Sequence, residues 1–282
     1  MKLPSREGGR LCRAPPRCEA SRALVFAFLA VFTASAAHAA GTASHDEPAA
    51  EVEARVKSVI DGSTLALEDG HGLRLAGIIA PMPPLDAEPG RRWPLAERAS
   101  AALRELALGR NVRLVLGGRR SDRYGRLVAQ VYRDDGMWLE GELLARGLAR
   151  VLTHKDERAL AAEMLARERE ARDARRGLWA TRAFAVLTPE EARHHLGSFE
   201  LVEGKVAEAR RSGARQFLRM GEDAHGGFTA VLLPESRRLF AAAGIAPDQL
   251  AGKRLRVRGF LRWWQGAIIE VDHPEQIEVL GP

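Results

Sequence analysis

Three short segments of the chain hold side chains that could act on a phosphate group. They are Val59–Thr64, Arg74–Met82 and Asp122–Arg126. Arg74 begins the second segment and Arg126 ends the third, and the planar guanidinium of arginine can bind two phosphate oxygens at once. The carboxylate of Asp61 in the first segment is the kind of ligand that a hard cation prefers. These residue types therefore allow binding of an anion such as phosphate, with or without a metal ion.

Hydrophobic patterning predicts the elements that must position these segments. Thr64–Leu67 and Leu73–Leu75 flank an Asp-Gly turn, which is typical of a β-hairpin. A helix is expected over Leu95–Leu108, because its apolar residues recur at helical spacing and a glycine follows. Further elements are expected as a strand from Val52, strands Asn111–Leu116 and Leu127–Tyr132, and helices Leu139–Arg146 and Asp156–Arg176. This inventory favours a fold that is mainly β with helices, built on a five-stranded barrel.

The order and spacing of the three segments resemble the staphylococcal nuclease (thermonuclease) family. The resemblance covers about Val52 to Trp179 and includes the Gly177-Leu178-Trp179 ending. It implies an oligonucleotide/oligosaccharide-binding (OB) barrel over residues 52–180. It also implies an activity, which is calcium-dependent phosphodiester hydrolysis as an endonuclease.

The resemblance also implies roles for individual residues. Arg74 and Arg126 would contact the scissile phosphate as the catalytic arginines, with Arg123 and Tyr124 in the same binding loop. Asp61 would lie near the calcium ion. Without that role, Arg74 would be a strand residue in a surface ion pair and Arg126 an ordinary hairpin residue.

The chain differs from the family at the positions of its negatively charged site residues. Ser63 and Ile79 stand at the positions of two calcium-binding carboxylates, and Met82 stands at the position of the glutamate beside the nucleophilic water. The Ser63 hydroxyl can still bind a cation beside Asp61, but it carries no charge. Because calcium affinity depends on the number of charged ligands, these two residues would form only a weak metal site. No cofactor is expected. Calcium binding is expected only if carboxylates from elsewhere in the chain supply the missing ligands. The candidates for rescue are Asp86, Glu88 and Glu97, which could equally be solvated charges.

A second strand-rich unit is expected after a linker at residues 181–196. Over residues 197–282 the pattern favours a second, smaller OB-type barrel. Strand alternation would place basic and aromatic side chains on one face, which suits contact with nucleic acid: Arg256, Arg258, Phe260, Arg262 and Trp264. Alternatively, Glu270 and Asp272 on the partner strand would neutralise these arginines and Trp264 would only pack.

The first 39 residues have the layout of a secretory signal peptide. A basic stretch precedes the apolar run Ala23–Phe32, and Ala37–Ala39 fits a cleavage site. We therefore expect a periplasmic or secreted protein with cleavage near Ala39, a flexible arm at residues 40–51, and no membrane span after cleavage. The alternative is an uncleaved membrane anchor.

Most of the net positive charge belongs to that leader. The chain carries +6, but residues 1–39 contain six basic and two acidic side chains, so the remainder carries 37 Lys and Arg against 35 Asp and Glu, or +2. Bulk charge therefore gives little support for nucleic-acid binding. Both cysteines, Cys12 and Cys18, also lie in the leader, which excludes disulfides and thiolate metal sites from the mature part.

Three functions are compatible with these observations. The first is binding of nucleic acid or another phosphodiester through the retained arginines, with weak or absent hydrolysis. The second is an active calcium-dependent nuclease whose missing ligands come from other residues. The third is a non-catalytic scaffold for protein contact in the cell envelope, whose partner is unknown, because fold alone does not determine function.

Overall fold

The structure is a computed structural model that describes residues 50–83, 88, 91–221 and 227–281. Residues Asp46–Pro282 form one compact unit. The expected signal peptide and all but the last two residues of the expected flexible arm lie outside the described residues. Those two residues, Ala50 and Glu51, are not a free arm. They begin β1 and pair with Leu116 and Val115 of β5, so the arm prediction is wrong there.

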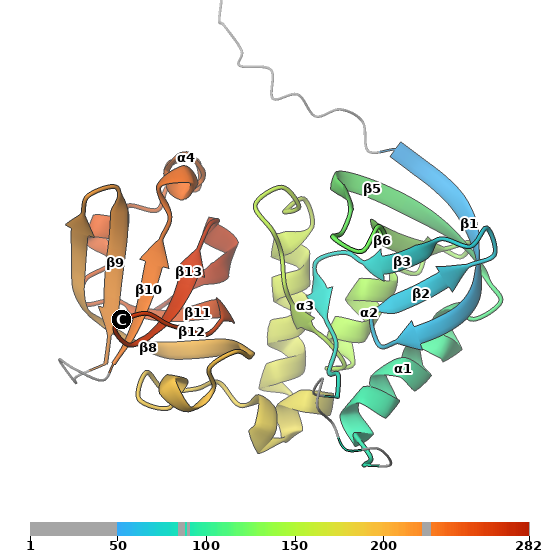
Figure 1. Cartoon of the computed structure of the whole chain (residues 1–282), viewed down its shortest axis with the longest axis horizontal. Coiled ribbons are helices and arrows are strands. Elements are labelled where there is room, and N and C mark those ends of the chain that lie inside the picture. The colour runs from blue at the N-terminus through green and yellow to red at the C-terminus, as the bar shows by residue number, and fades with distance from the viewer. Residues whose placement is uncertain (1–49, 84–87, 89–90, 222–226, 282) are drawn as a thin grey trace, which may run out of the picture. The chain divides into compact units, whose positions relative to one another are not determined.

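Five strands close into a barrel in the first part of this unit (Figure 1). They are β1 (Ala50–Asp61), β2 (Thr64–Leu67), β3 (Gly72–Leu75), β5 (Asn111–Ser121) and β6 (Leu127–Arg133). Neighbours pair antiparallel except β3 and β6, which are parallel, and β5 closes the ring on β1. The prediction of a mainly β fold with a five-stranded barrel and attached helices is confirmed.

Helices and a short two-stranded sheet cover this barrel. They are α1 (Pro94–Ala107), α2 (Leu139–Ala145), α3 (Ala161–Asp173), and the strands β4 (Ile78–Ile79) and β7 (Arg150–Val151). Leu103 and Leu106 of α1 are buried with Leu65, Leu73 and other barrel residues in one apolar core. The third predicted helix is shorter than expected, because residues 156–160 form a turn before α3.

Gly62 shows how closely α1 lies against the first segment. A Cβ atom at this position would come within 2.6 Å of the Ala99 Cβ and 2.8 Å of the Ala80 Cβ. Both distances are shorter than real Cβ contacts, so only glycine fits between β1 and β2 at this point. The close approach fixes the Asp61–Ser63 turn against the helix.

The C-terminal strands form one seven-stranded sheet in the order β12-β13-β10-β9-β8-β11-β14. Their bounds are β8 (Phe199–Ser212), β9 (Arg215–Met220), β10 (Phe228–Leu232), β11 (Arg254–Phe260), β12 (Arg262–Trp263), β13 (Ala267–Val271) and β14 (Ile277–Leu280), with α4 (Arg237–Ala242) between β10 and β11. Five of these strands repeat the pairing order of the first barrel, including one parallel pair, β10 with β13. No ladder joins β11 to β13 among the described residues, so the predicted second closed barrel is not confirmed.

Short 3-10 helices occupy most of the remaining connections. They are η1 (Gly177–Ala180), η2 (Arg182–Phe184), η3 (Ala192–His194), η4 (Pro234–Ser236), η5 (Pro247–Gln249) and η6 (Pro274–Gln276). Leu187 and Ala192, within the expected linker, are buried in the core of the C-terminal sheet. The domain boundaries drawn from the sequence stay a prediction. Within the described part of the chain, no helix is both long enough and apolar enough to cross a membrane.

Candidate functional site

The Asp122–Arg126 segment forms the tight connection between β5 and β6. Gly125 has φ +75°, a left-handed conformation that favours glycine, and its N–H donates to the Asp122 carbonyl at 3.1 Å. Asp122 Oδ1 accepts hydrogen bonds from the backbone N–H groups of Tyr124 and Arg126 at 2.8 and 3.1 Å. The loop therefore places one carboxylate at its own centre.

That carboxylate orients Arg126. Asp122 Oδ2 accepts from Arg126 Nε at 2.7 Å and lies 2.6 Å from Arg126 Nη2. Burial raises the pKa of Asp122, but the hydrogen bonds from the Arg126 side chain and the loop N–H groups outweigh it and hold the pKa below its usual range. The Nη1 group of Arg126 takes no part in this contact, so the guanidinium is fixed and can still donate to a phosphate.

Arg74 lies in β3, where its backbone pairs with Val128 of β6, the strand that follows the Asp122–Arg126 loop. Its side chain is half-buried, and Nη2 lies 3.5 Å from the Ile78 carbonyl oxygen. Burial lowers the pKa of Arg74, and the positive charge of Arg126 lowers it further. Two mutually repelling guanidinium groups thus share one neighbourhood, which an anion would stabilise.

Tyr124 extends the same loop into solvent with its side chain 67% exposed. The Cζ atoms of Arg123 and Arg126 lie 4.8 and 5.2 Å from its ring centroid. Arg123 Nη2 donates to the Tyr124 hydroxyl at 2.7 Å. The structure therefore brings Arg123 and Tyr124 beside Arg126, with an accessible aromatic ring.

The residues at the expected calcium site do not fit a calcium ion. Asp61 Oδ1 accepts hydrogen bonds from the Ser63 backbone N–H at 2.7 Å and the Ser63 hydroxyl at 3.1 Å, so it stabilises a turn. Ile79 packs against an apolar cluster, and Met82 is 53% exposed. No group of three or more His, Cys, Asp or Glu side chains that could hold a metal ion occurs within the described residues.

Two of the three carboxylates considered for rescue are described, and neither belongs to a group of side chains that could hold a metal ion. Glu97 is held by Arg92 at 2.6 Å, and Glu88 is exposed. Asp86 lies outside the described residues. Glu97 is therefore engaged by an arginine, and Glu88 has no carboxylate cluster around it within the described residues.

A small cavity of about 30 Å³ adjoins Arg74 and contains groups that the sequence did not suggest. Its lining includes Arg74, Asp122, Arg119, His154 and Glu157. The polar run Thr153–Glu157 follows β7, which pairs antiparallel with β4. The Leu152 N–H donates to the Gly77 carbonyl at 2.8 Å, which continues this pairing and brings the run beside the cavity.

Glu157 is the most perturbed of these groups. Burial, followed by the negative charge of Asp156, raises its pKa to about 7, although Arg119 and Arg74 act in the opposite direction. Burial and the positive charge of Arg119 lower the pKa of His154. A carboxyl group that titrates near neutrality beside an arginine has the properties of a general base.

Glu157 also gives a stability prediction. Its pKa in the folded chain is about 7 against an ordinary value of 4.5, so the folded state binds this proton more tightly than the unfolded state. The resulting stabilisation is complete below about pH 4.5 and is lost as the pH rises through 7, by up to about 3 kcal/mol. We expect Glu157→Gln to abolish this loss, and hence to be more stable than the parent chain at pH 8.

Urea unfolding at pH 5 and pH 8 measures this difference. Glu163→Gln, which changes an exposed glutamate of α3, is the matched control and should leave the pH dependence unchanged. Equal pH dependence in Glu157→Gln and Glu163→Gln would show that Glu157 is not the group that titrates.

The prediction of a nucleic-acid-binding face on β11 is wrong for two arginines, which are not free to contact a ligand. Arg258 is 2% exposed, with Nη2 at 2.8 Å from Glu168 Oε2 and 2.6 Å from Glu278 Oε1. Arg256 is half-buried between Glu203 at 2.6 Å and Glu278 at 3.2 Å. Both side chains neutralise glutamates, because α3 and the neighbouring strands cover this face of β11.

The other three residues of that expected face remain accessible, and Phe260 is 46% exposed. Arg262 donates to Glu270 at 3.0 Å, as the alternative interpretation expected, while its side chain is 67% exposed. Trp264 is 44% exposed and stacks on Phe217. The residues of the predicted face therefore do not act together. Arg256 and Arg258 belong to a buried cluster of ion pairs, whereas the others lie at the protein surface.

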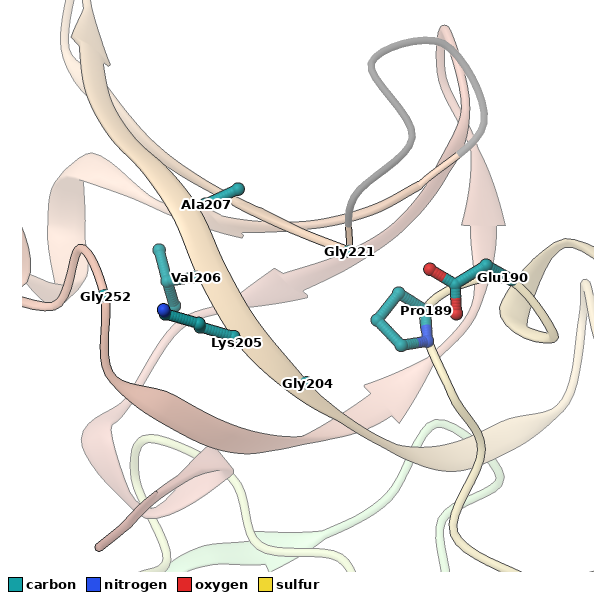
Figure 2. A pocket seen from close by; sticks show the side chains of 8 residues that line it. All are labelled: Pro189, Glu190, Gly204, Lys205, Val206, Ala207, Gly221 and Gly252. Atoms are coloured by element: carbon teal, nitrogen blue, oxygen red, sulfur yellow. The ribbon is translucent and has the colours of Figure 1, made fainter. Parts of the chain in front are cut away.

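A depression of about 1000 Å³ in the C-terminal sheet contains none of these groups. Figure 2 shows its lining, in which Lys205 and Glu190 are the charged side chains and Gly204, Gly221 and Gly252 expose backbone. The described residues of this lining offer neither an aromatic ring for stacking nor an arginine for bidentate phosphate contact. The cavity beside Arg74 is much smaller, but it is lined by the arginine, histidine and carboxylate side chains that could act on a phosphate.

Comparisons with known proteins point to the same region. A family model described as "Staphylococcal nuclease homologue" matches residues 72–181. An "Uncharacterized endonuclease" of Escherichia coli O157:H7 is 31% identical over 133 residues, which cover 46% of this chain and 78% of that protein. A protein of the same description from Escherichia coli matches with the same identity and coverage. The family match includes Arg74, Arg126 and Glu157 and leaves out Asp61 and Ser63.

Proposed function

The chain belongs to the staphylococcal nuclease homologue family, and from that premise we propose that it binds nucleic acid or another phosphodiester through Arg74 and Arg126, with little or no hydrolysis. Its function is nuclease- or nucleic-acid-related. The observation that carries the finer proposal is the bidentate contact between Asp122 and Arg126. It holds one guanidinium in place, next to the half-buried Arg74, before any ligand arrives.

This arrangement favours binding because the fold already holds the Arg126 side chain in one conformation, so little conformational entropy is lost when a ligand binds. Arginine side chains lose substantial rotamer freedom when they bind, and Asp122 has already fixed Arg126. Charge-assisted hydrogen bonds to phosphate are about twice as strong as neutral ones. The site therefore has the donors for an anion.

Weak hydrolysis follows from what Ser63, Ile79 and Met82 replace. Loss of a general base typically costs about 10²–10⁴ in rate. Loss of calcium-binding charge removes a Lewis acid that contributes several kcal/mol more. Incubating the protein with plasmid and single-stranded DNA, with calcium and with chelator, tests this directly. Rapid cleavage that depends on calcium would overturn the proposal.

Glu157 favours a second candidate function, a slow metal-independent phosphodiesterase. It lines the same cavity as Arg74, and its raised pKa suits proton abstraction from water near neutral pH. In this case cleavage in chelator would rise with pH through about 7, and Glu157→Gln would abolish it. Cleavage that survives Glu157→Gln unchanged would exclude this role.

We also propose that the protein is exported to the periplasm or secreted. The support is the basic stretch, the apolar run and the small-residue cleavage site within residues 1–39. N-terminal sequencing of the purified protein tests the proposal, which requires a new terminus near Ala39. An intact Met1 would contradict it.

A further inference from the structure

The outer face of the C-terminal sheet carries basic and aromatic side chains next to one another. In β9, Gln216 and Leu218 are buried, whereas the intervening Phe217 and Arg219 face outward. Phe217 pairs across the sheet with Arg210 of β8 and Val231 of β10. The outward face of β9 therefore has an aromatic ring flanked by arginines.

Trp264 completes an aromatic platform on this face. It lies in the turn between β12 and β13, where its N–H donates to the Gly266 carbonyl at 2.9 Å and Gln265 has φ +55°. This turn brings the indole ring onto Phe217, with ring centroids 5.8 Å apart and ring planes inclined by 29°. Trp264 nevertheless remains 44% exposed, so part of its ring is free for a ligand.

Positive charge surrounds the two rings. The Cζ of Arg210 lies 5.8 Å from the Phe217 centroid, and that of Arg215 lies 5.9 Å from the Trp264 centroid. Glu208 contacts Arg219 at 3.3 Å and Arg210 at 3.8 Å. Three arginines against one glutamate leave a local charge of +2.

All of these side chains except Arg215, which lies against the Trp264 ring, border a groove of about 300 Å³ that Ser212 and Thr229 also line. We propose that this groove binds single-stranded nucleic acid, with a base stacked on Trp264 and the phosphates on Arg210, Arg215 and Arg219. Exposed bases stack on aromatic rings, whereas a duplex hides its base faces, and the local charge attracts a polyanion. The site is separate from Arg74 and Arg126 and does not depend on them.

Trp263 provides a matched control for Trp264. It is the preceding residue, is also a tryptophan, and is 65% exposed. Trp263 ends β12 and does not belong to the described lining of the groove, which includes both Phe217 and Trp264. Replacing Trp263 removes more exposed ring area than replacing Trp264, but only Trp264 belongs to the proposed site.

The test uses the full chain carrying Arg74→Ala and Arg126→Ala, so that the other site does not contribute. Binding of a fluorescein-labelled deoxythymidine oligonucleotide of about ten nucleotides is followed by fluorescence anisotropy. Adding Trp264→Ala should weaken binding by roughly 5- to 100-fold, whereas Trp263→Ala should change it by less than about twofold. Equal losses in the two variants, or no binding before either is introduced, would overturn the proposal.

Further probes separate base stacking from charge. An abasic deoxyribose-phosphate oligomer of equal length carries the same charges without bases, and it should bind at least about fivefold more weakly. A heparin fragment and a duplex of the same length test other polyanions. Binding of any of these three as tight as that of the single strand would contradict the stacking role of Trp264.

Discussion

Replacing Arg258 by alanine is expected to destabilise the protein by about 3–5 kcal/mol, a severe loss for a single substitution. Arg258 is 2% exposed, and its guanidinium contacts Glu168 of α3, Glu278 of β14 and the Val151 carbonyl of β7. Glu168 is completely buried. Removing the arginine takes the closest cation from two carboxylates inside the protein and leaves them the longer contacts of Arg172 and Arg256, and a buried charge that loses its closest partner is costly.

Arg254→Ala is the control for this substitution. Arg254 lies in the same strand, β11, and contacts Glu203 at 2.8 Å, but its side chain is 61% exposed. A surface ion pair of this kind contributes about 0–1 kcal/mol. Urea unfolding followed by circular dichroism compares the two variants. A loss for Arg258→Ala no larger than that for Arg254→Ala would show that the buried cluster is not important for stability.

Replacing both Arg74 and Arg126 by alanine is expected to weaken binding of a nucleoside 3′,5′-bisphosphate by about 100-fold or more. Each hydrogen bond to a charged group contributes about 1.5–3 kcal/mol, so each single variant should lose about tenfold or more. Calorimetry on chains that also carry Trp264→Ala measures this affinity without base stacking on the C-terminal sheet.

Two further variants make this prediction specific. Arg104→Ala removes the same charge from an exposed position in the last turn of α1 and should leave affinity unchanged. Arg126→Lys keeps the charge but loses the planar fork, so it should bind more weakly than the parent chain. Unchanged affinity in the double variant would refute the role of both arginines.

Much of the first barrel and its arginines could be predicted from the sequence, because local patterns determine them. The Asp-Gly turn and the loop that ends in Gly125-Arg126 depend on residues a few positions apart. The absence of carboxylate side chains at Ser63 and Ile79 can be read directly from the sequence, and the structure adds that Asp61 is engaged with Ser63.

Glu157 could not be predicted because its place depends on distant pairing. It lies near Arg74 only because Val151 pairs with Ile78 across two strands of two residues each, which are too short to give a sequence pattern. Arg258 was misassigned for a related reason. Alternation shows which side chains share a face of β11, but it does not show that α3 covers that face with Glu168.

The affinity for a nucleoside 3′,5′-bisphosphate, measured by calorimetry with calcium and with chelator, tests the central claim most directly. If fixed arginines bind the phosphate and no calcium-binding carboxylates remain, the dissociation constant should agree within about twofold in the two conditions. Binding that appears only with calcium, or that tightens at least tenfold on its addition, would contradict a metal-independent phosphate site at Arg74 and Arg126.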